Sequence, residues 1–286
     1  MDPASPPSPT VAGYRWQEVE LAGGRRTRLI DTGGTGTPLV LVHGLSASIE
    51  QWQAVLPGLA EGRRVIAYDL AGFGWAEKPD VEYRYPMFAE QLRDVLDLLD
   101  LRRVDLLGSS LGATLIVRFE ALHPGRLRRA VLTNPGGFGR YVHPFLRVPT
   151  LPLLGGVVSR PTRIGSAFAV RLALARRELA TAEAIGAADA LSRLPGTHRA
   201  TVRTLRGVAS PLGVKERDTF EEQWAAMSHP TLVVWGRQDR LFPVSQMERA
   251  RALRPDARYE VIDRCGHFPQ LDQPERLVEL TRGHLG

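Results

Sequence analysis

A serine between two glycines is the first feature of this 286-residue chain whose residue types could do chemistry. Residues 108–112 read Gly-Ser-Ser-Leu-Gly, so Ser110 occupies the centre of a G-x-S-x-G pattern. The strand-like run RVDLL precedes the pattern, and the helix-like run LGATLIVRFEAL follows it. A sharp turn from strand to helix holds the serine hydroxyl out of the sheet, where it can act as a nucleophile. We therefore predict that Ser110 is the nucleophile and that Ser109, one residue out of phase, points elsewhere.

A serine hydroxyl becomes an effective nucleophile only when a neighbouring base takes its proton. His267 lies in the sequence DRCGHFPQLDQP, a loop that follows the last expected strand. Asp239 lies in LVVWGRQDRLFP, on a loop that follows the second-to-last expected strand. A carboxylate there can orient the imidazole of His267 and stabilise its charged form. Two other residues are less suited to be the acid. Asp263 lies at a strand end, where we expect it to make a loop hydrogen bond, and Asn134 follows another strand but has no carboxylate. The sequence thus predicts a catalytic triad of Ser110, Asp239 and His267.

The elements that would position this triad alternate along the chain. Helical periodicity predicts helices over residues 87–100, 111–123 and 274–284. The alternation of strands and helices predicts an α/β fold with a mostly parallel, eight-stranded sheet and helices on both faces. The expected strands lie in the runs RWQEVEL, RTRLIDT, PLVLVHG, RRVIAYDL, RVDLLGSS, RAVLTNP, PTLVVWG and ARYEVID.

The alternation stops after Asn134. Residues 136–228 contain no convincing strand, are helical by composition and are interrupted by several prolines. This region is therefore predicted to be a helical cap, inserted after the sixth strand between core residues 14–135 and 229–286. The opening residues, MDPASPPSPT, are rich in proline and have no apolar core, so residues 1–13 are predicted to form a disordered tail.

The chain order Ser110, Asp239, His267 is that of the α/β-hydrolase superfamily, which the chain resembles over about residues 14–286. His43-Gly44 resembles the oxyanion-loop motif of that superfamily, and DLAGFGWAEKP, residues 69–79, resembles its D-x-x-G-x-G loop. We expect His43 and Asp69 to hold these loops rather than to take part in the reaction. The resemblance further implies that the backbone N–H groups of two residues, Leu45 and Leu111, form the oxyanion hole.

Within the superfamily, the stretches GFGWAEKP and VIDRCGHFPQLDQPERL are similar to meta-cleavage-product hydrolases, which split carbon–carbon bonds, and to carboxylesterases. Those C–C hydrolases usually carry a glycine-rich stretch after His-Gly, where this chain has LSASIEQW. Haloalkane dehalogenases and epoxide hydrolases have an aspartate at the position of Ser110. The resemblance implies a serine hydrolase, with ester cleavage through an acyl-enzyme as the leading expectation. The alternatives are C–C hydrolysis of a vinylogous diketone acid bound by cap arginines, and a non-enzymatic ligand-binding use of the fold.

Apolar residues of the predicted cap would either line an acyl pocket or dock the cap on the core. A pocket of this kind would fit a small or medium apolar ester. The candidate lining residues are Phe138, Tyr141, Phe145, Leu146, Leu151 and Leu154.

The composition argues against several other classes of protein. The net charge is +6, but arginines are spread along the chain near acidic residues, which indicates a solvated surface rather than a nucleic-acid site. A mild attraction for anionic ligands or surfaces remains open. Histidines are isolated and Cys265 is the single cysteine, so neither a metal site, a cofactor nor a disulfide is expected. No apolar run reaches the roughly 20 residues of a membrane span and no signal peptide is recognisable, so we expect a cytoplasmic protein.

Overall fold

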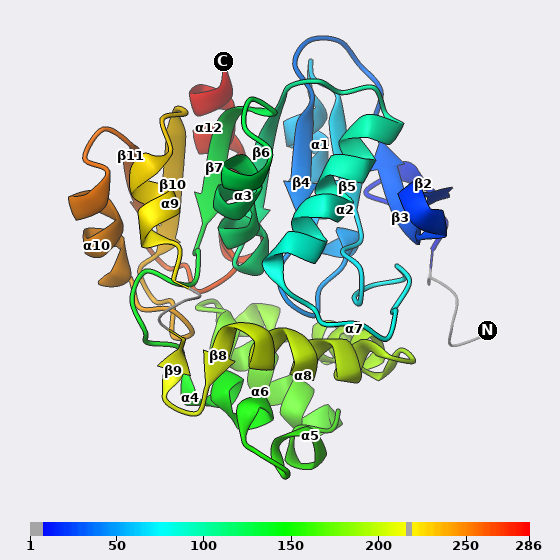
Figure 1. The fold of residues 1–286 in the computed structure, drawn as a ribbon, viewed down its shortest axis with the longest axis vertical. Coiled ribbons are helices and arrows are strands. Elements are labelled where there is room, and N and C mark those ends of the chain that lie inside the picture. Colours follow the sequence, from blue (N-terminus) through cyan, green and yellow to red (C-terminus); the bar gives the residue numbers. More distant parts are fainter. Residues whose placement is uncertain (1–7, 216–218) are drawn as a thin grey trace.

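A computed structural model describes residues 8–215 and 219–286 of the chain. Its main sheet has nine strands in the order β1-β2-β3-β5-β4-β6-β7-β10-β11, parallel from β5 to β11 and antiparallel from β1 to β5 (Figure 1). All eight predicted strands are present, and β1 adds a short ninth. The strands are β1 (Thr10–Val11), β2 (Tyr14–Glu20), β3 (Arg26–Asp31), β4 (Leu39–Val42), β5 (Val65–Tyr68), β6 (Val104–Ser109), β7 (Leu127–Thr133), β10 (Thr231–Gly236) and β11 (Arg258–Ile262).

Strand β1 corrects the predicted tail. Thr10 pairs with Arg15 and Val11 pairs with Tyr14, so the chain has joined the sheet before residue 14. Val11 is buried in the core, which explains why this short hairpin forms despite its proline-rich approach. The prediction of disorder is therefore wrong from Thr10 onward, and residues 1–7 of the predicted tail lie outside the described residues.

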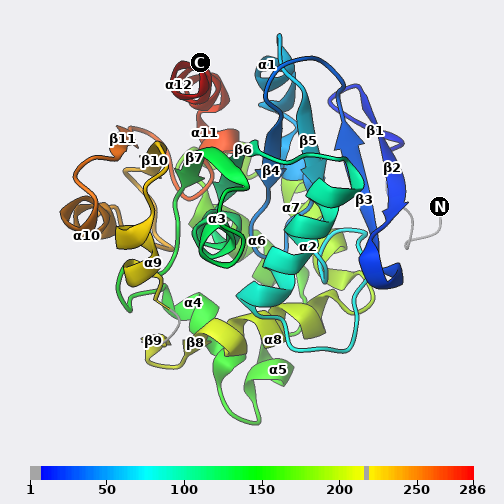
Figure 2. The same ribbon diagram turned by 45° about the horizontal axis from the view of Figure 1, so that its top comes forward.

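Two helical layers cover the sheet because successive strand residues face opposite sides. On β4, Val40 and Val42 belong to one apolar cluster, and Leu39 and Leu41 belong to the other. The first side carries α2 (Tyr85–Leu98), α3 (Leu111–Leu122), α9 (Glu221–Ala226) and α10 (Gln246–Leu253) (Figure 2). The second side carries η2 (Ile49–Trp52), α1 (Leu56–Ala60), α11 (Pro269–Asp272) and α12 (Pro274–Leu285), and η1 (Ala22–Gly24) lies between β2 and β3.

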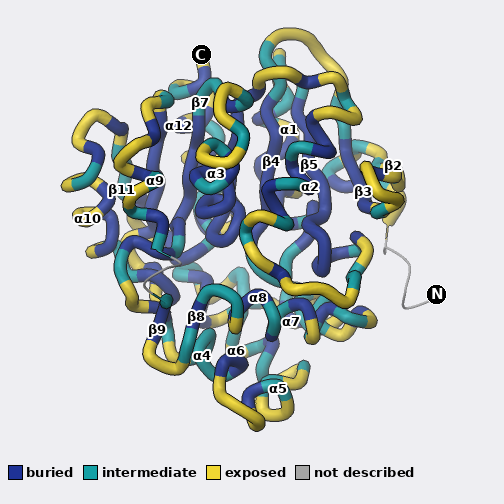
Figure 3. Tube along the Cα trace, viewed as in Figure 1, coloured by how far each residue is buried: buried dark blue, intermediate teal, exposed yellow. Residues whose placement is uncertain are grey.

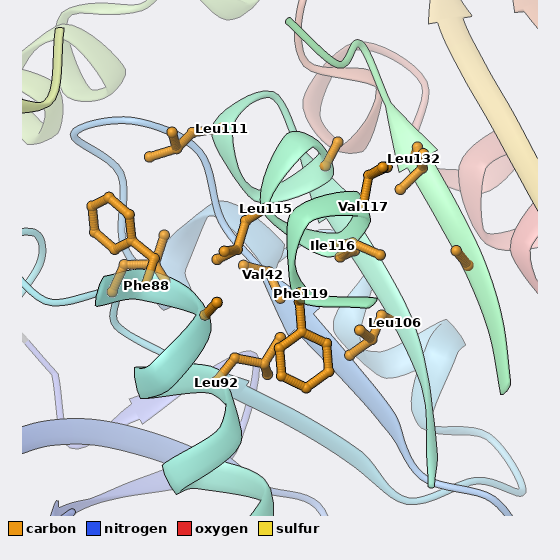
Figure 4. Packing of buried hydrophobic residues seen from close by; sticks show 14 of the residues in the cluster. Val42, Phe88, Leu92, Leu106, Leu111, Leu115, Ile116, Val117, Phe119 and Leu132 are labelled. Carbon is orange, nitrogen blue, oxygen red and sulfur yellow. The ribbon is translucent and has the colours of Figure 1, made fainter. Parts of the chain in front are cut away.

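Helix α3 is fixed by dense apolar packing. Figure 4 shows Leu115 and Phe119 of α3 among side chains from α2, such as Phe88, and from the strands, such as Leu106. Each of these side chains is fully buried, and burial of such a side chain typically contributes about 1.5–3 kcal/mol. The N-terminus of α3, where Ser110 lies, is therefore held in place by the core.

Between β7 and β10, residues 144–214 lie beneath the carboxyl ends of the parallel strands (Figure 1), and much of this stretch is exposed or half-buried (Figure 3). Helix α9, which follows it, covers the sheet instead. We call residues 136–228 the inserted segment. Contrary to prediction it contains a small hairpin of β8 (Ala209–Ser210) and β9 (Gly213–Val214), whose strands are too short to show alternation in sequence. Its helices before the hairpin are α4 (Pro144–Arg147), η3 (Val148–Thr150), α5 (Gly155–Val158), α6 (Arg163–Ala173), η4 (Arg177–Leu179), α7 (Ala182–Arg193) and α8 (Thr197–Val208).

Candidate active site

Ser110 lies in a strained turn between β6 and α3. Its φ of 54° and ψ of −113° are unusual for a residue with a side chain. Its backbone N–H donates to the carbonyl of Thr133 on β7 at 2.9 Å. A Cβ at Gly108 would lie 2.5 Å from the carbonyl carbon of Gly112, and a Cβ at Gly112 would lie 2.1 Å from the carbonyl oxygen of Val42. Both glycines are therefore required for the strand, turn and helix to pack this closely.

Ser109 points into the core, as expected from its phase. Its Oγ accepts hydrogen bonds from Gln51 Nε2 at 3.0 Å and Gln270 Nε2 at 3.2 Å. Gln51 Oε1 in turn accepts the N–H of Gly44 at 2.9 Å. Because Gln270 follows His267 closely in sequence, these bonds tie the serine turn to the loop that carries the histidine.

His267 and Asp239 form a buried, hydrogen-bonded pair. His267 Nδ1 lies 2.8 Å from Asp239 Oδ2. An ionised carboxylate only accepts, so Nδ1 carries the hydrogen and Nε2 keeps a lone pair. Asp239 Oδ1 accepts the backbone N–H groups of Leu241 at 2.8 Å and Phe242 at 3.1 Å, which fix the orientation of the carboxylate.

Asn134 is a member of this network whose role sequence reasoning missed. Its Nδ2 donates to Asp239 Oδ2 at 2.6 Å and to the carbonyl of Gly266 at 3.3 Å. The backbone of Asn134 also has a positive φ, of 48°. The available signal was its place after β7, because β7 adjoins β10 in the sheet and the two strands end at the same edge. Asn134 thus binds Oδ2 of Asp239, whereas the two backbone N–H groups bind Oδ1.

The two backbone segments expected to form an oxyanion hole adjoin Ser110. Leu111 is the first residue of α3, so its N–H has no acceptor within the helix. Leu45 follows Gly44, and a Cβ at Gly44 would lie only 3.4 Å from Ser110 Cβ. An oxyanion hole made by Leu45 and Leu111 remains a prediction, and this placement is compatible with it.

His43 holds two loops together, as expected. Its Nε2 accepts the N–H of Leu70 at 2.9 Å, and its Nδ1 lies 2.8 Å from the carbonyl of Gly44. Nδ1 must therefore donate and the ring is neutral. Complete burial lowers the pKa of His43, which favours the same neutral form.

Asp69 likewise holds the loop that it begins. Its Oδ1 accepts the N–H of Ile49 at 2.8 Å, and its Oδ2 accepts the N–H of Trp75 at 2.9 Å. The Nε of Arg28 donates to the same Oδ2 at 2.8 Å, so the buried charge of Asp69 is paired. Asp69 supports the loop beside the candidate site through these bonds.

A buried carboxylate that the sequence did not single out, Asp272, joins the histidine loop to the inserted segment. Its Oδ2 accepts the N–H of Gly266 at 2.7 Å and that of Ala175 at 3.0 Å. Its Oδ1 accepts the N–H of Arg176 at 3.0 Å. These partners lie almost a hundred residues apart in the chain, so no local pattern could have indicated the contact.

The inserted segment makes two further contacts at this edge of the sheet. The backbone N–H of His267 donates to the carbonyl of Ala173 at 2.7 Å. Ser46 Oγ lies 2.7 Å from Oγ1 of Thr201 on α8. The inserted segment therefore contacts both the loop of the candidate base and the loop of the candidate oxyanion hole.

The six residues predicted to line an acyl pocket lie in different parts of the structure. Phe138 is buried in an aromatic cluster, with its ring centroid 4.6 Å from that of Phe220 and 5.6 Å from that of Trp224. Leu151 and Leu154 are exposed near α5, at the end of the inserted segment farthest from the sheet (Figure 1). This placement does not support a pocket role for these three residues.

The remaining three pocket candidates also differ in their surroundings. Tyr141 is exposed, and its ring lies beneath the guanidinium of Arg147. Phe145 and Leu146 are half-buried and pack against the apolar cluster that contains Leu111. Phe145 and Leu146 therefore remain as candidate lining residues, whereas Tyr141 does not.

Cys265 is a packed thiol rather than a reactive one. It is buried, forms no disulfide, and burial raises its pKa well above the ordinary value. Across the described residues, no group of three or more His, Cys, Asp or Glu side chains is arranged to hold a metal ion.

Comparison with known proteins agrees with this geometry. Residues 37–274 match the profile of the alpha/beta hydrolase fold family. The 2-hydroxy-6-oxo-2,4-heptadienoate hydrolase of Pseudomonas putida is 31% identical over 274 residues, which are 93% of this chain and 94% of that protein. The 2-hydroxymuconate semialdehyde hydrolase of a Pseudomonas species is 30% identical, over 93% of this chain and 92% of that protein.

Solved structures of two activities resemble the fold. The meta-cleavage product hydrolase CumD superposes with a TM-score of 0.81 at 25% identity, covering 94% of this chain and 97% of that one. A thermophilic esterase from Thermogutta terrifontis superposes with a TM-score of 0.77 at 26% identity, covering 94% and 98%. By its sequence match and its architecture, the chain belongs to the α/β-hydrolase fold family and is a hydrolase of that family.

Proposed function

We propose that this protein is a serine hydrolase that cleaves carboxylic esters of small to medium apolar acids. The observation that carries the proposal is the strained Ser110 turn at the same sheet edge as the buried His267–Asp239 hydrogen bond. Nucleophilic acyl transfer requires a serine hydroxyl held out of its turn and an oriented imidazole that can take its proton, and these two features support the proposal.

In this mechanism Ser110 Oγ attacks the acyl carbonyl carbon while His267 Nε2 takes the hydroxyl proton. Asp239 and Asn134 keep the imidazole in the tautomer that leaves Nε2 free to accept. The N–H groups of Leu45 and Leu111 stabilise the tetrahedral oxyanion, each typically by about 3 kcal/mol.

The intermediate then collapses as the carbon–oxygen bond of the ester breaks. His267 returns its proton to the leaving alkoxide, which departs as the alcohol and leaves an acyl group on Ser110. A water molecule, deprotonated by the same Nε2, then attacks the acyl carbon. The bond from this carbon to Ser110 Oγ breaks, His267 returns the proton to Oγ, and the acid is released. No metal or cofactor takes part in any of these steps.

We further propose that the inserted segment caps the site and makes it apolar. Two aromatic rings adjoin the imidazole of His267, with centroids at 5.5 Å for Phe242 and 5.0 Å for Phe268. Phe145 and Leu146 of the inserted segment are half-buried and pack against the apolar core on the α3 side of the sheet. Such surroundings favour an apolar acyl group over a charged one.

The names of the relatives favour a second candidate, C–C bond hydrolysis of a dienoate acid. A buried cation without a protein acceptor would be a strong partner for the carboxylate of such a substrate. Each described arginine of the inserted segment is instead exposed or hydrogen-bonded to a protein oxygen, as Arg147 is to Val142 and Arg203 is to Val81. The arrangement of cations therefore supports an ester over a dienoate as substrate.

The test compares p-nitrophenyl esters of increasing acyl length with one ring-fission dienoate acid. Ser110→Ala should lower kcat by at least about a thousandfold while leaving thermal unfolding unchanged. Ser109→Ala is the matched control, because its hydroxyl is bonded to glutamines in the core, and it should keep kcat within about tenfold. A fluorophosphonate probe should label the wild type and not Ser110→Ala.

Three outcomes would contradict the proposal in different ways. Near-full activity of Ser110→Ala would exclude this serine as the nucleophile. Faster turnover of the dienoate than of every ester would establish the C–C alternative. A folded wild type that neither hydrolyses esters nor reacts with the probe would point to a non-enzymatic ligand-binding use of the fold.

A further inference from the structure

We propose that the outer end of the inserted segment docks on the surface of an anionic phospholipid bilayer. We call this surface the apolar tip. It lies around α5, at the end of the segment farthest from the sheet (Figure 1). The tip comprises Leu151, Leu153, Leu154, Val157, Val158, Ile164 and Phe168.

Exposed apolar side chains are concentrated at the tip. Of the thirteen large hydrophobic residues that are exposed in the described parts of the chain, seven lie between Leu151 and Phe168. Leu153 is 94% exposed and Ile164 is 84% exposed, so their side chains have almost no cover from the protein. Such a concentration of exposed apolar side chains in one short segment indicates an interaction site on a protein that is otherwise well packed.

The backbone at the tip is also unusual. Leu153 has a φ of 57°, a conformation that a bulky side chain rarely adopts. Burial of the side chain cannot stabilise this conformation, because Leu153 is exposed. Strain held at an exposed leucine points to a partner that takes up its side chain.

The charge around the tip favours an anionic partner. Between residues 147 and 171 the sequence contains four arginines and no aspartate or glutamate. Arg160 and Arg163, within the tip region, are exposed. Asp189, which accepts a hydrogen bond from Ser166 of α6, is paired with Arg193 at 2.8 Å. A second copy of the chain would bring the same positive charge, whereas acidic lipid headgroups would complement it.

Apolar side chains surrounded by basic ones are the pattern of a protein that lies in a membrane interface rather than across the bilayer. Among the described helices, none is long and apolar enough to span a membrane. The tip would therefore place Leu153, Val157 and Ile164 among the acyl chains and Arg160 and Arg163 at the headgroups. This docking requires no catalysis and is independent of the proposed function.

The first experiment measures co-sedimentation of the full chain with vesicles. Equimolar phosphatidylcholine and phosphatidylglycerol should bind the wild type, and phosphatidylcholine alone should not. The combined variant Leu153→Ser, Val157→Ser, Ile164→Ser should bind at least about tenfold more weakly, because each residue loses apolar transfer energy. Leu98→Ser is the matched control, since Leu98 is exposed at the end of α2 on the sheet domain, and it should bind like the wild type.

A second set of variants tests the charge. Arg160→Gln and Arg163→Gln should each weaken binding by roughly fivefold, and added salt should weaken the wild type in the same direction. Arg15→Gln, an exposed arginine on β2, removes the same charge elsewhere and should change binding by much less. Thermal unfolding of every variant verifies that the fold is intact, and Ser110→Ala should bind vesicles like the wild type.

Two results would overturn the proposal. Failure of the wild type to bind the anionic vesicles would exclude the bilayer as partner. The other result concerns the combined variant Leu153→Ser, Val157→Ser, Ile164→Ser. If it bound vesicles like the wild type but lost a concentration-dependent self-association that the wild type shows, the tip would instead mediate contacts between copies of the chain. Neither result depends on whether Ser110 is a nucleophile.

Discussion

The two sides of the candidate site are built in different ways. On the sheet side, Ser110, Asp239 and His267 are buried, and short bonds through Asn134 and backbone groups fix their positions. On the other side, the inserted segment consists of short helices with much exposed surface (Figure 3). The sheet side resists change, because each atom there has close neighbours. The inserted segment can vary its outer residues without disturbing the groups that would do the chemistry.

A matched pair of glycine substitutions tests this difference most strongly. Gly112→Ala places a Cβ 2.1 Å from the carbonyl oxygen of Val42, so unfolding free energy should fall by about 3 kcal/mol or more. Gly186→Ala, in α7 of the inserted segment, meets nothing within 4 Å and should stabilise by about 0.5–1 kcal/mol through helix propensity. Urea denaturation measures both. If the two substitutions changed the unfolding free energy by the same amount, the two sides would be equally tolerant, which would contradict the comparison.

Asp272 tests whether the inserted segment affects the histidine loop. Asp272→Asn keeps the size of the side chain but offers one acceptor oxygen to three backbone donors. We expect kcat for the ester to fall by about tenfold to a hundredfold with little change in KM, and stability to fall by about 2 kcal/mol.

Asp263→Asn is the control, because Asp263 is an exposed carboxylate in the same loop, and its ion pair with Arg237 is worth at most about 1 kcal/mol. Unchanged kinetics in Asp272→Asn, despite lower stability, would mean that the contact is structural and does not position His267.

His43 gives the smallest expected effect, a dependence of stability on pH. Burial lowers the pKa of His43 in the native state, so the unfolded chain binds a proton first as pH falls below the ordinary value of about 6.5. Unfolding free energy should therefore be highest above that pH and should decrease below it, by up to about 1.4 kcal/mol per pH unit.

Denaturation at several pH values measures this slope, which His43→Asn should reduce. Burial and Arg160 also lower the pKa of His198, but this side chain is only half-buried, so His198→Gln should reduce the slope less than His43→Asn does. A slope unaffected by His43→Asn would assign the acid sensitivity to other groups.

The sequence predicted those parts of the molecule whose signals are local. The strands of the core are continuous apolar runs that end in glycine or a polar residue, as PLVLVHG does around His43. The serine turn is marked by Gly108 and Gly112, and both glycines prove necessary on steric grounds. The hydrogen bond between Asp239 and His267 could also be predicted, because each residue follows a strand directly, and neighbouring parallel strands bring their carboxyl ends together.

The missed features depend on contacts between distant segments or on elements too short for periodicity. Asn134 meets Asp239 across 105 residues, and its place after a strand, the one signal in the sequence, does not identify its partner. The proline-interrupted helices of the inserted segment are too short to reveal which face is buried, so Leu151 and Leu154 were assigned to a pocket although they are exposed. Phe138 and Trp224 lie within the predicted cap by sequence but pack together in the core.

The contact between Asp272 and residues 175 and 176 has a consequence for protein engineering. Chimeras that exchange the insert for that of a relative are an obvious route to new substrate ranges. In this chain the donor must also supply backbone groups that replace those of Ala173, Ala175 and Arg176. A graft without them would remove backbone partners of the loop that carries His267, the candidate base, so the insert is not a detachable module.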